Sequence, residues 1–408
     1  MRAPVAVRTP RQRMATPRLL RLLRFGIVLS MLLAAAASAW ALNHGATDMA
    51  TIARGTDQVQ RLQVIRGNIL RADGLATNGL AQASEPAAQR ESYRALLDEA
   101  ARLTVVASDA QPLDQAGLAE ANAGLVRYAA TIELARTVYP TNATSALARV
   151  DEAQATLRDQ VLPALDRLDA DNQGRVDAAR STGRSGWPFV ATVPIAVALL
   201  ALVLVAMRTR RLVNIGLALA LVAGLGLWQV TDSALGRATT AVDAAHSGPF
   251  RTAMATSHAY AAASDAKSSE GRLTLQTSAA AAGDARWRER VARARSALAE
   301  GAGPADLSAK LDAYEAAYGV LQRASAAKRS GDVARLAGDA SAAGVNPTFA
   351  AFADASRAVA DAAGAETART MSERQDALGL GVAFAVLLGL AGAIAGAMGA
   401  NLRLEEYR

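Results

Sequence analysis

The sequence predicts an all-α membrane protein with four transmembrane helices and two extracytoplasmic up-down four-helix bundles in tandem. The first observation is a set of apolar runs, each long enough to cross a bilayer. The second is that these runs bracket two polar, Ala-rich stretches of about 145 residues each. The third is the residue usage of those stretches, where Ala, Leu, Arg, Glu and Gln favour helix and aromatic residues are rare. Connected antiparallel helices of this length predict bundles.

Four apolar runs contain no Asp, Glu, Lys or Arg. A helix rises about 1.5 Å per residue, so roughly 20 residues cross the hydrocarbon core. The first run, Phe25–Leu42, follows a basic segment and ends in small residues, so both a retained anchor and a cleavable signal peptide fit it. Either alternative exports the residues that follow. The other three runs predict transmembrane helices at 187–207, 212–230 and 378–400.

The arginines predict the orientation of the chain. Seven of them, and no acidic residue, occupy residues 1–24, and three more occupy the loop 208–211. Short Arg-rich segments stay in the cytoplasm. Four crossings then place the tail 401–408 on the same side, so we expect a multi-pass protein of the plasma (inner) membrane with both termini cytoplasmic. The cytoplasmic segments then carry a formal charge of +10 and the exported remainder −3, which together give the net +7. The basic residues therefore lie against anionic lipid, and no nucleic-acid partner is expected.

The two outer domains are predicted at residues 43–186 and 231–377. Pro86, Pro112 and Pro140 divide the first of them, because proline is tolerated in a first helical turn and breaks a helix interior. This punctuation predicts helices at 46–83, 87–108, 113–138 and 142–182.

Further prolines and glycines predict local features of both domains. Pro163 should kink the last helix of the first domain. In the second domain, residues 246–249 (HSGP) predict a break or kink, and residues 301–304 (GAGP) separate two helices. The pair Asn346–Pro347 predicts an N-cap followed by a first-turn proline. The last helix, 347–375, should run on toward the fourth apolar run.

No constellation of catalytic or metal-binding residues is visible. His44, His246 and His258 do not pair with one another or with acids at metal-ligand spacing, and the chain contains no Cys. No phosphate-binding loop or hydrolase motif is present. The apolar runs carry no ionisable group, which argues against a solute pathway. The sequence therefore predicts neither an enzyme nor a transporter, and no metal or cofactor.

Charged and amide side chains gather toward the membrane-distal end of the first helix of each domain. Two interpretations stay open for them, a solvated bundle tip or a surface for a ligand or partner. They are Arg66, Arg71, Asp73 and Asn78 in the first domain and Asp265, Lys267, Glu270 and Arg272 in the second.

The cytoplasmic segments add up to about 36 residues, fewer than the roughly 40 that a domain needs to fold unaided. A signal directed inward would therefore need a second protein docked on them. Gly392 and Gly396 are spaced for close helix packing, which makes a homodimer possible. The candidate docking residues are Arg208, Arg210, Arg211, Arg403, Glu405, Glu406, Tyr407 and Arg408.

Three stretches carry a resemblance to a known family: RADGLATNGL (71–80), TVYPTNATSALARVDEAQATLRDQVLPALDRL (137–168) and ASDAKSSEGRLTL (263–275). With the tandem architecture, the chain resembles the GlnX-like membrane proteins of actinobacteria, whose bundles are like chemoreceptor sensor domains. The resemblance implies a non-enzymatic transducer. Its partners would be a glutamine/glutamate/aspartate-binding lipoprotein outside and a Ser/Thr kinase, protein kinase G, inside. The resemblance assigns no binding residue. The alternative is a ligand-independent scaffold of the cell envelope.

Overall fold

The structure, a computed structural model, describes residues 16–80, 85–182, 214–275, 280–301 and 303–405, together with the short helical pieces 192–193, 195–197, 199–200 and 203–204. Within these residues every regular element is a helix. The α-helices are α1 (Thr16–Leu80), α2 (Ala87–Ala110), α3 (Gln115–Val138), α4 (Ala143–Thr156), α5 (Leu162–Thr182), α7 (Ile215–Ser247), α8 (Pro249–Leu275), α9 (Ala280–Glu300), α10 (Ala305–Ala326), α11 (Ser330–Ala337) and α12 (Val345–Glu405). A 3₁₀ turn, η1 (Pro112–Asp114), precedes α3, and a π-helical turn, η2 (Leu157–Val161), joins α4 to α5.

The chain divides into two compact units. The membrane unit comprises residues 1–49, 181–241 and 373–408, and the head unit comprises residues 50–180 and 242–372. Helices α1 and α12 contribute residues to both units.

Three helical stretches are long and apolar enough to cross a bilayer: Arg21–Leu80, Ile215–Gly271 and Val345–Leu402. They contain the predicted first and fourth apolar runs and most of the third, and they characterise the chain as a membrane protein. The predicted second run, 187–207, lies largely outside the described residues. Outward-facing side chains of the stretches include Phe25, Leu219 and Leu387, each more than half exposed, as expected for helices that face lipid.

Small residues let the helices of the membrane unit approach closely. A Cβ on Gly216 of α7 would lie 2.5 Å from the Cα of Gly399 on α12, so the two backbones are in contact. The side-chain oxygen of Asn214 accepts hydrogen bonds from the first turn of α7, and its Nδ2 donates to the Gly399 carbonyl at 2.9 Å. The Gly392 and Gly396 positions pack against Met31 and Ile27 of α1, so this glycine pair contacts the chain itself.

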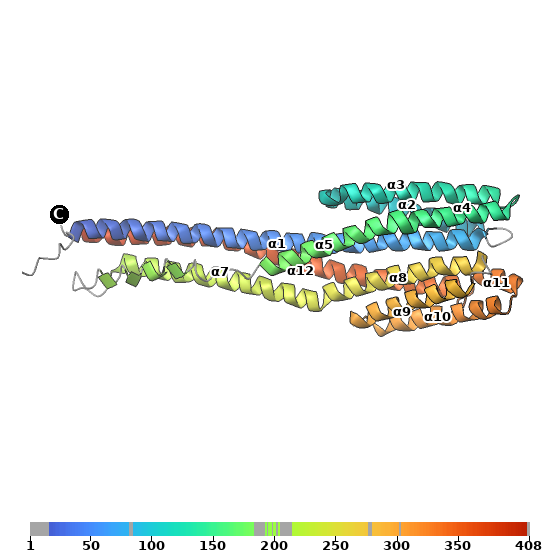
Figure 1. The fold of residues 1–408 in the computed structure, drawn as a ribbon. Coiled ribbons are helices and arrows are strands. Elements are labelled where there is room, and N and C mark those ends of the chain that lie inside the picture. The colour runs from blue at the N-terminus through green and yellow to red at the C-terminus, as the bar shows by residue number, and fades with distance from the viewer. Residues whose placement is uncertain are drawn as a thin grey trace, which may run out of the picture. The chain divides into compact units, whose positions relative to one another are not determined.

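The first half of the head has one hydrophobic core. Helices α1, α2, α3, α4 and α5 all contribute to it, and α3 and α4 lie side by side in Figure 1. The helix ends agree closely with those predicted from the prolines. Pro163, where the sequence predicts a kink, is preceded by η2, the π-helical turn. Proline cannot donate the i→i−4 hydrogen bond, and the wider turn accommodates that loss.

The second half of the head has its own core, built by α8 to α12, with α8, α9 and α10 alongside one another (Figure 1). The predicted break at 246–249 is present, because α7 ends at Ser247 and α8 begins at Pro249. The predicted N-cap at Asn346 is wrong. Helix α12 begins at Val345, one residue before Asn346, so Asn346 already lies within the helix. Its side chain donates to the Ala337 carbonyl at the end of α11, a short helix that the sequence did not predict.

Candidate functional site

Helices α1 and α8 pack in parallel and join the two halves of the head. Tyr260 on α8 donates to the Asn68 side chain on α1 at 2.8 Å, and Asn78 donates to Glu270 at 3.4 Å. Both pairs are separated by 192 residues in sequence, so the register stays constant along the contact. Glycine permits this approach, since a Cβ on Gly74 would lie 2.9 Å from the Lys267 carbonyl oxygen.

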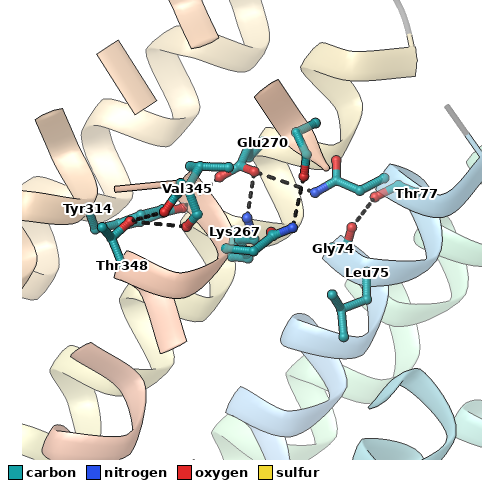
Figure 2. Close-up of polar contacts among 12 residues, drawn as sticks. Gly74, Leu75, Thr77, Lys267, Glu270, Tyr314, Val345 and Thr348 are labelled. Carbon is teal, nitrogen blue, oxygen red and sulfur yellow. Dashed lines mark hydrogen bonds and ion pairs between the residues drawn. The ribbon is translucent and has the colours of Figure 1, made fainter. Parts of the chain in front are cut away.

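A buried ion pair lies on the α1 side of α8. Lys267 Nζ is 2.5 Å from Glu270 Oε1, and the Tyr314 hydroxyl donates to Glu270 Oε2 at 3.1 Å. Figure 2 shows the pair between Tyr314 and the helix that carries Gly74 and Thr77. Burial lowers the pKa of the Lys267 ammonium, and the Glu270 carboxylate opposes this effect. Burial and the nearby Glu270 charge raise the pKa of Tyr314.

Asp73 on α1 occupies a comparable position in the first half. Its carboxylate accepts hydrogen bonds from the Tyr128 hydroxyl and Gln154 Nε2, both at 3.1 Å, and also from the Ser268 hydroxyl of α8. Burial, followed by the Asp73 charge, raises the pKa of Tyr128. Each half of the head therefore has a buried acid that accepts from a buried tyrosine, and the Ser268 contact extends the first network into the second half.

The structure separates seven of the eight predicted head residues into two groups. Asp73, Asn78, Lys267 and Glu270 are at most 1% exposed, so they form a polar contact inside the head and no solvated tip. The others lie at the margins in ion pairs: Arg66 with Asp166, Arg71 with Asp354, and Asp265 with Arg290. Arg272 belongs to α8, and its side chain lies outside the described residues.

Beside the Asp73 network lies a cleft of about 400 Å³. Its walls are supplied by α1, α4, η2 and α5 from the first half and by α8 and α9 from the second. Figure 1 labels the five α-helices of this set. Two ion pairs flank the cleft, Arg66–Asp166 in the first half and Arg290–Asp265 in the second, the latter at 2.6 Å. The lining residues are Arg66, Leu70, Asp73, Gln154, Leu157, Arg158, Leu162, Pro163, Asp166, Asp265, Ser268, Ser269, Arg286, Arg290 and Arg293.

Arginines dominate the charge of this cleft. Five guanidinium groups line it against three carboxylates, so an anionic group entering it meets a positive field. Sequence reasoning missed four of them, Arg158 in η2 and Arg286, Arg290 and Arg293 on α9. The spacing of four and three residues places the three on α9 on one helix face, and this periodicity was the available signal.

A second cleft, of about 370 Å³, lies where α5 faces α8, α9 and the end of α7. The His246 ring stacks on Phe250 across the α7–α8 break, with centroids 5.2 Å apart. Burial, and next the Arg180 charge, lower the pKa of His246. His258, which also lines this cleft, lies 3.8 Å from the Asp169 carboxylate.

Most of the predicted cytoplasmic docking residues lie outside the part of the chain that the structure describes. These residues are Arg208, Arg210, Arg211, Glu406, Tyr407 and Arg408. The side chain of Arg403 also lies outside the described residues. Glu405 is exposed at the last position of α12. Among the residues that the structure describes, no group of three or more His, Asp or Glu side chains is arranged to hold a metal ion.

A helical head and apolar helices long enough to cross a bilayer define the class as a helical membrane protein, and one comparison adds a sensing role. Residues 48–181 match the family model of the actinobacterial sensor domain. This range covers the first half of the head from α1 to α5, and the match supports an actinobacterial sensor protein. The chain matches no curated protein and no solved structure.

Proposed function

We propose that this protein is a non-enzymatic transmembrane signal transducer of the GlnX-like type. It relays the availability of extracytoplasmic glutamine, glutamate or aspartate, received through a solute-binding lipoprotein, to a cytoplasmic Ser/Thr kinase. The observation that carries the proposal is the position of the charged cleft. One of its walls is built by α1, η2 and α5, which belong to the residues matching a sensor domain. The kinase and lipoprotein rest on the family resemblance.

The proposal includes a definite topology. Four transmembrane helices hold both termini in the cytoplasm, and the two halves of the head are tandem four-helix bundles outside. Two long helices support it: α1 has 65 residues and α12 has 61, and each contains an apolar stretch as well as residues of the head. A continuous helix can transmit a small shift or rotation along its length. Such transmission requires a ligand or partner whose affinity differs between two states.

Kinase docking is tested by co-purification. The kinase is recovered with the full chain from membranes, and recovery is compared with a variant in which residues 401–408 are replaced by a Gly-Ser segment of equal length. We expect the replacement to abolish recovery, because the tail supplies five of the eight predicted docking side chains and the Gly-Ser segment removes them together. Unchanged recovery would contradict the role of the tail.

Sensing is tested separately with the lipoprotein. Full chain in nanodiscs is titrated with the purified lipoprotein, with and without glutamine, glutamate or aspartate. The relay predicts that at least one amino acid changes lipoprotein affinity by about 5-fold or more, the usual size of an allosteric coupling. Equal affinity under all conditions would favour the alternative function, a ligand-independent scaffold of the cell envelope.

A further inference from the structure

We propose that the cleft between the two halves of the head binds a small dianion directly, at one site per chain. The ligand class is a short dicarboxylate or a phosphate. The inference rests on the proposed sensor function and deepens it, because it gives the chain a ligand of its own in addition to the lipoprotein.

Three of the five arginines that line the cleft already have a carboxylate partner. Arg66 and Arg290 are each committed to a carboxylate, Asp166 and Asp265 respectively. Arg293 pairs with Glu289 on its own helix, four residues away. The cleft therefore holds three guanidinium groups whose charge is already balanced, so a ligand must be recognised by the remaining arginines.

Two arginines remain, one from each half of the head. Arg286 on α9 has no ion-pair partner among the described residues, and Arg158 in η2 donates only from Nε, to the Gln154 carbonyl. Both side chains are exposed at the cleft, so their planar N–H groups are free for an anion. Arginine binds carboxylate and phosphate through two parallel hydrogen bonds, so two such groups suit a ligand with two negative charges.

The carboxylates that line the cleft bear on whether a positively charged ligand would bind there. Of the three lining carboxylates, Asp166 and Asp265 are paired with arginines, and Asp73 already accepts from Tyr128, Gln154 and Ser268. Each of the three lining carboxylates thus already has a partner, and five arginines outnumber them, so an ammonium group would meet a net positive field. This favours a dianion over a free amino acid or an amine in this particular cleft.

The packing of α1 against α8 at a constant register leaves two opposite faces of this contact on which a dianion site could form. On the face away from the cleft, α1 packs directly on α12: Gln60 donates to the Ala360 carbonyl at 2.9 Å, and Arg71 pairs with Asp354. The Arg71 guanidinium also lies 5.8 Å from the centre of the Phe349 ring. The arginine of that face is thus neutralised, so that face does not repeat the dianion site.

Isothermal titration of the full chain in nanodiscs tests the proposal, with succinate and inorganic phosphate as separate probes and ethylenediamine as a dication of similar size. We expect one of the two anions to bind with a stoichiometry near one and the dication not to bind. The anion that binds identifies the source of the charge. Binding of neither anion, preferential binding of the dication, or a stoichiometry of two would each overturn the proposal.

The double variant Arg158→Gln/Arg286→Gln should weaken the binding by about 100-fold or more, since two charge-assisted contacts are lost. The matched control Arg149→Gln/Arg295→Gln removes the same total charge, also one arginine from each half, at exposed positions outside the lining. It should bind as the unaltered chain does. An equal loss in both variants would show only general charge attraction and would overturn the site. Neither the lipoprotein titration nor kinase recovery enters this test, so failure of the relay and failure of the dianion site are distinguishable.

Discussion

Lys267 and Glu270 form an ion pair whose two side chains are 2% and 0% exposed, with Nζ and Oε1 2.5 Å apart. They lie one helical turn apart on α8, at the contact with α1. Transferring each charge out of water costs several kcal/mol, and only the partner and further hydrogen bonds offset that penalty. The Tyr314 hydroxyl and the Asn78 amide supply those bonds, and both partners come from other helices. The pair therefore depends on the assembled head.

Removing one member of this pair should destabilise the head strongly. Lys267→Met leaves the Glu270 carboxylate buried without its counterion, and we expect a loss of about 3–5 kcal/mol. The double variant Lys267→Met/Glu270→Gln removes both charges, and the glutamine carbonyl oxygen still accepts a hydrogen bond from one of the two donors, Tyr314 or Asn78. It should recover most of the loss, as measured by thermal or denaturant unfolding. A double variant no more stable than the single one would contradict this account.

The close contact of α1 and α8 predicts a large effect of one methyl group. In Gly74→Ala, the new Cβ would lie 2.9 Å from the Lys267 backbone oxygen, which cannot rotate away, so the helices must separate. We expect a loss of about 1–3 kcal/mol in unfolding experiments.

Gly174→Ala is the matched control for that substitution. Gly174 lies within α5, and a Cβ there would meet no heavy atom within 4 Å. Higher helix propensity should stabilise this variant by about 0.5–1 kcal/mol. We therefore expect Gly74→Ala to lower the free energy of unfolding and Gly174→Ala to raise it. Equal effects of the two substitutions would refute the close contact.

Acidification should destabilise the head through His246. Its pKa lies below the ordinary value of 6.5, first because of burial and then because of Arg180, with Arg251 acting in the same direction and Asp177 and Asp243 opposing. The unfolded chain therefore binds a proton at a higher pH than the folded chain. The linked stability is fully present above pH 6.5 and is lost as pH falls through the lower folded pKa.

The measurement is the melting temperature of the full chain and of His246→Gln over a series of pH values on both sides of 6.5. We expect His246→Gln to have the shallower decline on the acidic side, because glutamine does not take up a proton. Identical slopes would exclude His246 as the group responsible.

In the membrane unit, Asn214 is predicted to stabilise the fold in two ways, by capping α7 and by donating a hydrogen bond to α12. Asn214→Ala removes the cap of α7 and the hydrogen bond to Gly399, with an expected total loss of about 1–2 kcal/mol. Asn214→Ser retains an N-cap acceptor but is too short to span the distance to α12, so its loss should be intermediate. Thermal unfolding in detergent micelles distinguishes the three proteins, and a serine variant as unstable as the alanine variant would argue that capping is unimportant.

Features that depend on neighbouring residues were predictable from the sequence. The apolar runs in α1, α7 and α12 are visible because a span needs about 20 apolar residues in succession. The N-terminal ends of α2 and α3 follow from Pro86 and Pro112, because a proline restricts its own backbone and fits at the start of a helix. Asn346 shows the limit even here, because its side chain found the Ala337 carbonyl of an unpredicted helix in place of its own helix end.

The role of the polar residues depends on tertiary packing. Asp73, Lys267 and Glu270 are as polar as any surface residue, and nothing in their local spacing shows that a helix from the other half of the chain covers them. Hydrophobic periodicity describes one helix at a time. The burial of an ion pair, and the division of arginines between neutral pairs and an open cleft, depend on which helices meet across nearly 200 residues of sequence. The chain therefore determines its helices and its apolar spans locally, whereas packing of α1 against α8 determines its candidate site.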